Sequence, residues 1–126
     1  MKFQKISTLL IWSEHYKELA DWYQKTFDLK IEDQLNHPKD TGISFDFPDG
    51  TTRLWIGQHS EIHGKSKDPK RIMFNITVDS VEKAYTYLVK KGVKILAKPF
   101  KAPTFNKYFI TFYDLDGNVV QCIGDK

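Results

Sequence analysis

The sequence predicts an α+β fold built from two copies of a β-α-β-β-β module. The order of strand-like and helix-like patterns in residues 1–57 recurs in residues 71–126. An Asp-Gly turn signal also precedes the last strand of each half, at Gly50 and again 67 residues later at Gly117. A length of 126 residues fits one domain. We therefore expect a single domain with module 1 at residues 1–57, a linker at residues 58–70 and module 2 at residues 71–126.

The first half opens with the apolar run Ile6–Trp12, which is typical of a strand. Ser13 follows and is able to cap a helix, because its hydroxyl can accept a hydrogen bond from an early helical amide. Apolar residues then recur at helical spacing and predict an amphipathic helix at residues 14–27. Strand patterns follow at residues 29–34, 42–47 and 52–57, and the last two flank the turn signal Pro48-Asp49-Gly50.

The second half repeats this order after the polar linker. A strand is predicted at residues 72–78, and Asp79-Ser80 is a cap signal for a second helix that starts at Val81. Gly92 is placed to end that helix in a left-handed conformation. Further strands are predicted at residues 93–97, 108–113 and 118–123. Residues 47–57 also align without a gap on residues 114–124, with identities at Asp-Gly and Ile-Gly, which together with the repeated order indicates a duplication.

Composition narrows the function classes. Apolar residues make up 40% of the chain and charged residues 28%, as in ordinary globular proteins. The net charge of +3 is modest, and the basic run Lys65–Arg71 is interrupted by Asp68 and Pro69, so we expect a solvated loop and no nucleic-acid partner. The apolar run near the N-terminus is too short for a signal peptide or a membrane span, which makes a cytoplasmic location the expectation. The single cysteine, Cys122, excludes an intramolecular disulfide and a cysteine-cluster zinc site, and we expect it to face the helix layer.

Several motifs in order resemble the vicinal oxygen chelate superfamily, which includes glyoxalases, bleomycin-resistance proteins and dioxygenases. The strongest is Phe112-Tyr113-Asp114-Leu115-Asp116-Gly117-Asn118, which is similar to the family's Asp-Pro-Asp-Gly-Asn turn with leucine where proline is usual. Trp22-Tyr23, Phe27-Asp28-Leu29 and the stretch Val81–Lys91 with Gly92-Val93 match other recurring family segments. The resemblance implies two modules whose sheets curve around a cup that holds a small molecule or a metal ion.

In metal-dependent members, the ligands come from the first and last strands of each module, where carboxylate and imidazole groups converge on a divalent ion. Carried over to this chain, these positions fall on Thr8, Leu54, Met73 and Gln121, or, with a slip of one residue, on Ser7, Trp55 and Ile72 in place of the first three. This donor set supplies no anionic charge, so we expect neither a metal nor another cofactor. His59 and His63 lie in the linker, His15 begins a surface helix and His37 precedes a turn, so we expect none of the four histidines to act as a ligand.

Strand alternation then predicts the lining of the cup. The predicted lining residues are Thr8, Leu10 and Trp12 on the first strand, Met73, Asn75 and Thr77 on the fifth, and Val119, Gln121 and Ile123 on the last. The segment Lys98–Lys107 is expected to form a loop at the mouth, where Phe100 or Phe105 either stacks on a ligand or pins the loop to the core. The predicted lining residues either form an open pocket or fill a closed core.

The residues expected to bind a ligand are mainly apolar, and no acidic cluster lies on the predicted cup strands. A metal-independent protein that binds a small apolar or aromatic molecule, similar to the drug-binding members and homodimeric like them, is the first interpretation. An enzyme of the glyoxalase or dioxygenase kind with a divergent site is the alternative. The predicted ligand-binding residues are Thr8, Leu10, Trp12, Leu54, Trp55, Met73, Asn75, Phe105 and Gln121.

Overall fold

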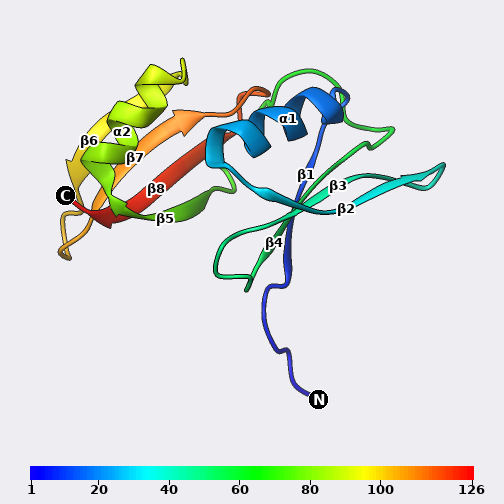
Figure 1. The fold of residues 1–126 in the computed structure, drawn as a ribbon, viewed down its shortest axis with the longest axis horizontal. Helices are drawn as coiled ribbons and strands as arrows, with labels where there is room; N and C mark the ends of the chain where they lie inside the picture. Colours follow the sequence, from blue (N-terminus) through cyan, green and yellow to red (C-terminus); the bar gives the residue numbers. More distant parts are fainter. The chain divides into compact units, whose positions relative to one another are not determined.

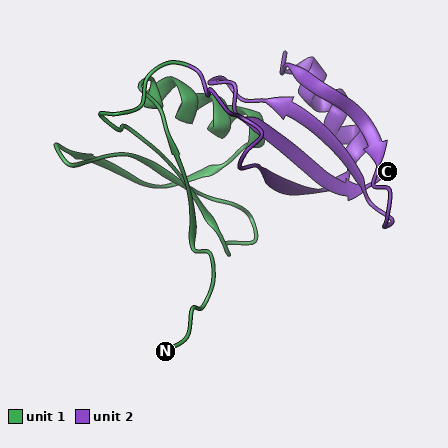
Figure 2. Cartoon of the chain, turned by 180° about the vertical axis from the view of Figure 1, so that it is seen from behind, with its two compact units in different colours: residues 1–64 green, residues 65–126 purple.

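The computed structural model describes residues 1–126 as two compact units, residues 1–64 and residues 65–126 (Figure 2). Unit 1 holds β1 (Thr8–Trp12), α1 (Tyr16–Phe27), β2 (Lys30–His37), β3 (Asp40–Asp46) and β4 (Arg53–Gly57). Unit 2 holds β5 (Phe74–Ser80), α2 (Val81–Lys90), β6 (Ile95–Lys101), β7 (Tyr108–Tyr113) and β8 (Val119–Asp125). The division between the units falls inside the predicted linker.

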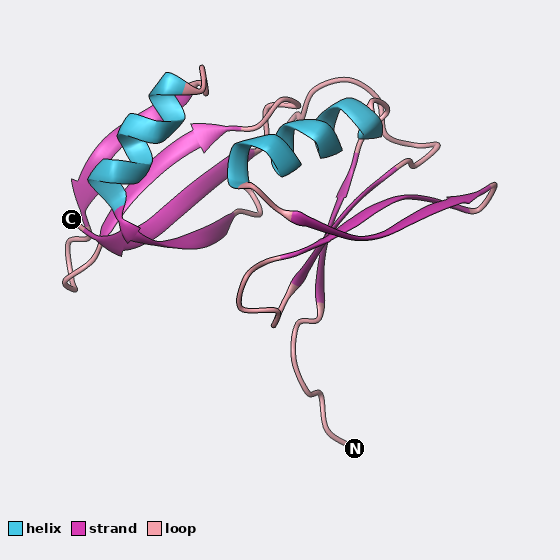
Figure 3. Ribbon diagram, in the orientation of Figure 1, coloured by secondary structure: helices cyan, strands magenta, loops and turns pink.

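Both units have the same sheet topology (Figures 1 and 3). The strand order is β1-β4-β3-β2 in unit 1 and β5-β8-β7-β6 in unit 2. In each unit the first strand pairs in parallel with the last, and the remaining pairs are antiparallel. The repeated β-α-β-β-β order predicted from the sequence is therefore confirmed. No helix is long and apolar enough to cross a membrane.

Each helix covers one face of its own sheet. In unit 1, α1 packs on β3 and β4 through Leu19, Ala20 and Tyr23. The sheet residues below it, Phe45, Leu54 and Ile56, are at most 1% exposed. In unit 2, α2 contributes Val81 and Leu88 to a core that also contains Ile110, Phe112, Val120 and Cys122. Burial of Cys122 confirms that its side chain faces the helix layer.

The helix ends agree with the sequence prediction at Ser80 and Gly92 and differ at Ser13. Ser80 caps α2, since its Oγ accepts a hydrogen bond from Lys83 N at 3.3 Å. Gly92 follows α2 with a φ of 80°, as predicted. Asp28, the residue that ends α1, takes the left-handed conformation with a φ of 52°. Ser13 Oγ accepts from His15 N at 3.0 Å, so it orders the residue before α1, and His15 itself is the cap residue.

Several strand boundaries correct the sequence prediction, among them that of β5, which begins at Phe74 although a strand was predicted from residue 72. The first strand begins at Thr8, and Ile6 is exposed outside it. The segment Lys98–Lys107 was expected to be a loop throughout, but β6 continues to Lys101. Pro99 is accommodated because β6 is an edge strand and its pairing with β7 shifts register between Ala97 and Phe100.

The two modules differ by one residue in the loop before their last strand. Six residues, 47–52, join β3 to β4, whereas five residues, 114–118, join β7 to β8. Ser44 pairs with Trp55 in unit 1, and Thr111 pairs with Gln121 in unit 2. Ser44 and Thr111 are 67 positions apart, but Trp55 and Gln121 are only 66 positions apart. The ungapped alignment is therefore correct for the turn and wrong by one residue in the strand. The Ile-Gly identity in the alignment therefore matches residues that are one position apart in β4 and β8. Because side chains alternate between faces, the matched side chains lie on opposite faces of their sheets.

Candidate ligand-binding faces

The face of the unit 1 sheet that points away from α1 carries the aromatic residues singled out in the sequence. Trp55 alternates with Leu54 and Ile56, so it lies on the opposite side from the helix. The parallel register of β1 with β4 pairs Leu10 with Trp55 and Trp12 with Gly57, which places their side chains on the same face. We call this surface the indole face; it comprises Thr8, Leu10, Trp12, Gly42, Ser44, Asp46, Arg53, Trp55 and Gly57.

Two glycines make room for the Trp55 side chain. Gly42 and Gly57 pair across β3 and β4. A Cβ atom on Gly42 would lie 2.4 Å from Trp55 Cζ2, and one on Gly57 would lie 2.4 Å from Trp55 Nε1. The indole therefore lies flat against the backbone at this pair, and Trp55 is only 8% exposed. Any larger residue at either glycine would displace the ring.

Trp12 and His59 border the Trp55 ring system. The centroids of the Trp12 and Trp55 rings are 6.3 Å apart at an interplanar angle of 70°, and those of Trp12 and His59 are 5.4 Å apart at 65°. His59 Nδ1 accepts a hydrogen bond from Glu61 N at 3.1 Å, which leaves the ring hydrogen of the neutral imidazole on Nε2. The sequence assigned His59 to a loop, which is correct, but gave no sign of its contact with Trp12.

Glu14 holds the other end of the loop that carries His59. Its carboxylate accepts a hydrogen bond from Gly64 N at 2.7 Å, and this bond is the main reason that the pKa of Glu14 lies below its usual value. His63 Nδ1 lies 3.5 Å from the same carboxylate. The start of the loop is fixed as well, because Gln58 N donates to Thr41 O at 3.0 Å. His59 therefore extends from a loop that is anchored on both sides.

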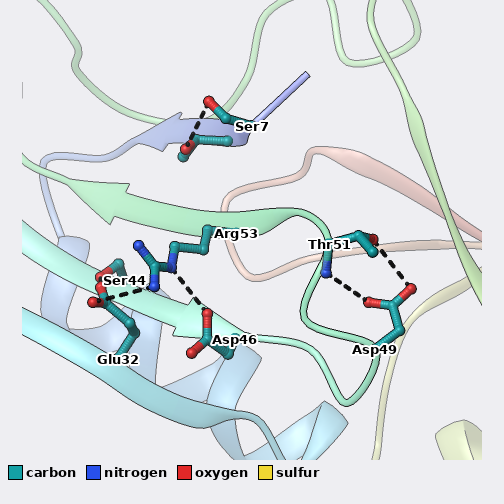
Figure 4. A network of polar contacts seen from close by, with 8 residues as sticks. Ser7, Glu32, Ser44, Asp46, Asp49, Thr51 and Arg53 are labelled. Atoms are coloured by element: carbon teal, nitrogen blue, oxygen red, sulfur yellow. Dashed lines mark hydrogen bonds and ion pairs between the residues drawn. The ribbon is translucent and has the colours of Figure 1, made fainter. Parts of the chain in front are cut away.

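A polar network lies on the same face, where Ser44 pairs with Trp55. Figure 4 shows its residues Glu32, Ser44, Asp46 and Arg53. Ser44 Oγ donates to Glu32 at 2.6 Å, and the Arg53 guanidinium lies 3.5 Å from Glu32 and 3.0 Å from Asp46. The hydrogen bond to Asp46 raises the pKa of Arg53. Two carboxylates thus share one guanidinium, so the network is formally anionic. Glu32 and Asp46 lie on β2 and β3, outside the first and last strands for which the sequence predicted no acidic cluster, so that prediction did not cover these groups.

The sequence could not reveal this network because it depends on a bulge. The pairing of β2 with β3 shifts register between Ile31 and Asp33, which brings the Glu32 side chain to Ser44. A bulge changes the face on which a side chain lies without leaving a local composition signal. Arg53 and Asp46 are cross-strand partners, and that pairing was recoverable in principle from the hairpin.

The unit 2 sheet presents the equivalent face, on which Gln121 replaces Trp55. Gln121 Nε2 donates to Thr111 Oγ1 at 3.1 Å, so the protein supplies one of the partners that this amide requires. Asn75 pairs with Gln121, and Ile123 with Phe109. A cavity of about 370 Å³ opens where this face meets the strand ends; it is lined by Thr77, Val78, Asp79, Lys107, Ile123, Gly124 and Asp125.

Phe105 lies in the loop after β6, is 51% exposed and makes an edge contact with Phe109 at a centroid distance of 6.1 Å. Phe100 stacks on the same ring at 5.6 Å. Phe105 therefore leans on the sheet, which fits the pinning alternative, whereas Phe100 is part of β6; both keep an exposed side. Met73 lies one residue before β5 and is half-exposed.

Leu54 requires a correction. It was placed in the cup by the ungapped alignment, but it is 0% exposed on the face that α1 covers. The extra residue in the loop before β4 moves Trp55, instead of Leu54, into the place equivalent to Gln121. The predicted residues Thr8, Leu10, Trp12 and Trp55 share the indole face of unit 1, whereas Asn75 and Gln121 share the face of unit 2.

The four positions where the resemblance places metal ligands do not fit a divalent ion. With the corrected register they are Thr8, Trp55, Met73 and Gln121. Indole offers only a donor, thioether sulfur is a weak ligand, and neither hydroxyl nor amide supplies negative charge. No group of three or more histidine, cysteine, aspartate or glutamate side chains is arranged to hold a metal.

The family model for the Glyoxalase/Bleomycin resistance protein/Dioxygenase superfamily matches residues 5–122. Among similar solved structures, a domain from Frankia sp. EAN1pec described as glyoxylase/bleomycin resistance protein/dioxygenase has a TM-score of 0.80 at 14% identity, covering 99% of this chain and 100% of that one. A glyoxalase family protein from Enterococcus faecalis has a TM-score of 0.76 at 17% identity, covering 98% and 99%. TnmS3, described as an antibiotic binding protein from Streptomyces sp. CB03234, has a TM-score of 0.79 at 16% identity, covering 100% and 99%.

No curated protein matched the chain. The family model nevertheless spans most of it, and the structural matches extend over nearly its whole length with the same fold. The chain therefore belongs to the Glyoxalase/Bleomycin resistance protein/Dioxygenase superfamily.

Proposed function

We propose that the chain is a metal-independent binding protein for a small aromatic molecule, similar in activity to the drug-binding members of its superfamily. The observation that carries this proposal is the Trp55 indole laid over Gly42 and Gly57, with Trp12 at its edge. If this sheet face served only as a packed core, side chains of ordinary size could fill it, and a tryptophan laid over two glycines would not be required.

The aromatic shelf formed by Trp12, Trp55 and His59 suits a flat ligand. Aromatic rings prefer offset-stacked or edge-to-face contacts with centroids about 4.5–7 Å apart, and each such contact adds about 0.5–1.5 kcal/mol beyond the burial of area. A ligand ring beside Trp12 would find edges and faces of other rings on the same surface. The polar network of Glu32, Ser44, Asp46 and Arg53 borders the shelf and would fix the ligand's orientation.

The comparison with TnmS3 supports an activity of the same kind, because that protein is described as antibiotic binding and has the same fold over its full length. The donor chemistry of Thr8, Trp55, Met73 and Gln121 supports binding without a metal. Elemental analysis of protein purified without chelators is expected to give well under one divalent ion per chain. A stoichiometric zinc, nickel, iron or manganese ion lost on mutation of these strands would favour the enzyme alternative.

Thermal shift screening with a panel of planar aromatic compounds tests the binding proposal. A compound at one hundred times its dissociation constant adds about 2.7 kcal/mol to the free energy of unfolding. Trp12→Ala is expected to abolish the shift. Trp22→Phe is the matched control, because Trp22 lies on α1 against Tyr23 and Phe27. If no compound in the panel stabilises the protein, or if Trp12→Ala leaves the shift intact, the proposal is wrong.

We also propose that the protein is a homodimer, as the resemblance to drug-binding members implies. Light scattering coupled to size exclusion gives the mass in solution directly. A mass near twice 14.8 kDa is expected, and a mass near 14.8 kDa over a wide range of concentrations would contradict this assignment.

A further inference from the structure

Trp55 Nε1 is the one buried side-chain nitrogen or oxygen atom in residues 1–126 that has no hydrogen-bond partner. An indole N–H can only donate. A buried donor without an acceptor costs about 1–3 kcal/mol, so a bound molecule that supplies an acceptor recovers this cost. We infer that the ligand of the indole face presents an oxygen acceptor, a carbonyl or a carboxylate, to Trp55 Nε1. This inference rests on the proposed function.

The protein offers no acceptor of its own at this atom. Two backbone carbonyls belong to the strands around Nε1, and both are engaged: Gly57 O accepts from Ser13 N at 2.9 Å, and Thr41 O accepts from Gln58 N at 3.0 Å. The position of a Cβ on Gly57 lies 2.9 Å from Thr41 O and 2.4 Å from Nε1, so this carbonyl and the indole nitrogen border the same space. Each carbonyl accepts a backbone hydrogen bond, and neither accepts one from Nε1.

The carboxylates of the same face belong to the polar network at its other end. Glu32 accepts from the Ser44 hydroxyl and pairs with Arg53, and Asp46 also pairs with Arg53. These groups lie toward the start of β4, whereas the indole extends toward Gly57 at its end. Neither carboxylate is placed to satisfy Nε1.

His59 adds a second donor to this part of the face. Its Nδ1 accepts from Glu61 N, so the neutral ring carries its hydrogen on Nε2 and can only donate there. The ring touches Trp12, which in turn touches Trp55. Two ring N–H donors at this end of the face favour a ligand that brings an oxygen atom to them.

A pair of probes of matched shape tests this inference. 2-Acetylnaphthalene carries a carbonyl oxygen where 2-isopropenylnaphthalene carries a methylene group. The carbonyl compound is expected to bind about five- to tenfold more tightly, which is the net effect of one hydrogen bond. In a ¹H–¹⁵N spectrum of the three indole groups, it should move the Trp55 Nε1–H resonance downfield, and the hydrocarbon should not.

Variants assign the effect to the indole nitrogen. In Trp55→Phe the preference for the carbonyl compound is expected to disappear, whereas Trp22→Phe should keep it. If Trp55→Phe does not fold, the spectra of the unchanged protein decide alone. Equal affinity of the two probes with an unmoved Trp55 resonance would overturn the inference and leave the proposed function standing. Failure of both probes and of the whole aromatic panel to bind would overturn the two together.

Discussion

The Nε1 atom of Trp55 occupies the space in which a side chain on Gly57 would begin, 2.4 Å from the ideal Cβ position. Atoms that are not bonded do not approach so closely, so the indole at position 55 and a side chain at position 57 exclude each other. This relationship fixes where the indole lies, and through it the position of the unpartnered N–H.

Gly57→Ala is expected to destabilise the protein by about 1–3 kcal/mol, because the added methyl group forces the indole off the backbone. Urea unfolding measures the change in the free energy of unfolding. In a Trp55→Ala background the same substitution should cost less, since two of the three atoms nearest to the added methyl group belong to the indole. An equal cost in the two backgrounds would show that the indole is not the obstacle.

Asp114→Ala is expected to destabilise the protein by about 2–4 kcal/mol. The Asp114 carboxylate is buried and accepts from Asp116 N and Asn118 N, both at 2.9 Å, and from Asn118 Nδ2 at 2.8 Å. The turn of module 1 provides the comparison, because Asp49 accepts only from Thr51 and is exposed. Asp49→Ala should cost less than about 1 kcal/mol, and similar losses for the two variants in urea unfolding would contradict this account.

Asp28→Gly is expected to stabilise the protein by about 0.5 kcal/mol. Asp28 ends α1 with a φ of 52°, a left-handed conformation that costs a residue with a Cβ more than it costs glycine. The gain is reduced because glycine has more freedom in the unfolded chain. Thermal unfolding of Asp28→Gly beside Asp28→Ala checks this, and a glycine variant less stable than the alanine variant would disprove it.

Cys122 should resist modification in the folded protein, because burial raises the pKa of its thiol to about 12. At pH 8 only about one thiol in ten thousand is then ionised, and the thiolate is the reactive form. A disulfide reagent such as dithionitrobenzoate should react slowly with native protein and rapidly in urea. Fast native reaction at pH 8 would show that the thiol is accessible.

The raised pKa of Cys122 also makes the free energy of unfolding fall as the pH becomes alkaline. The folded pKa lies above the unfolded value of 9.0, so the contribution of Cys122 is complete below pH 9 and declines as pH rises toward about 12. Between pH 9 and 10 the loss should be about 1 kcal/mol. Cys122→Ala should lack this part of the decline, which separates it from lysine and tyrosine titration. Parallel stability curves for the two proteins would contradict the assignment.

Local patterns in the sequence were sufficient for the order of the elements. The apolar spacing from Tyr16 to Phe27 and the cap at Ser80 each depend on neighbours within a few residues, and both reappear in the structure. The fold class followed because the same order occurs twice. Fold and family were thus accessible from the sequence.

The candidate site was less accessible because it depends on single-residue shifts. Because the loop 47–52 has one extra residue, Trp55 lies on the indole face in place of Leu54. A bulge in β2 brings Glu32 to Ser44. The contact of His59 with Trp12 follows from a loop held by Glu14, a bond that spans 50 positions. Periodicity gives the probable faces of a strand but does not count residues in a loop.

The corrected register also reveals that the two modules distribute side-chain volume in opposite ways. Trp55 corresponds to Gln121. The two glycines that make room for the indole, Gly57 and Gly42, correspond to the bulky residues Ile123 and Phe109. Substituting Gly57 alone by isoleucine overfills the face, and substituting Trp55 alone by glutamine leaves it hollow. An evolutionary path of single substitutions between the two arrangements therefore passes through a destabilised intermediate. Conversion of one packing arrangement into the other therefore requires concerted changes at positions 42, 55 and 57.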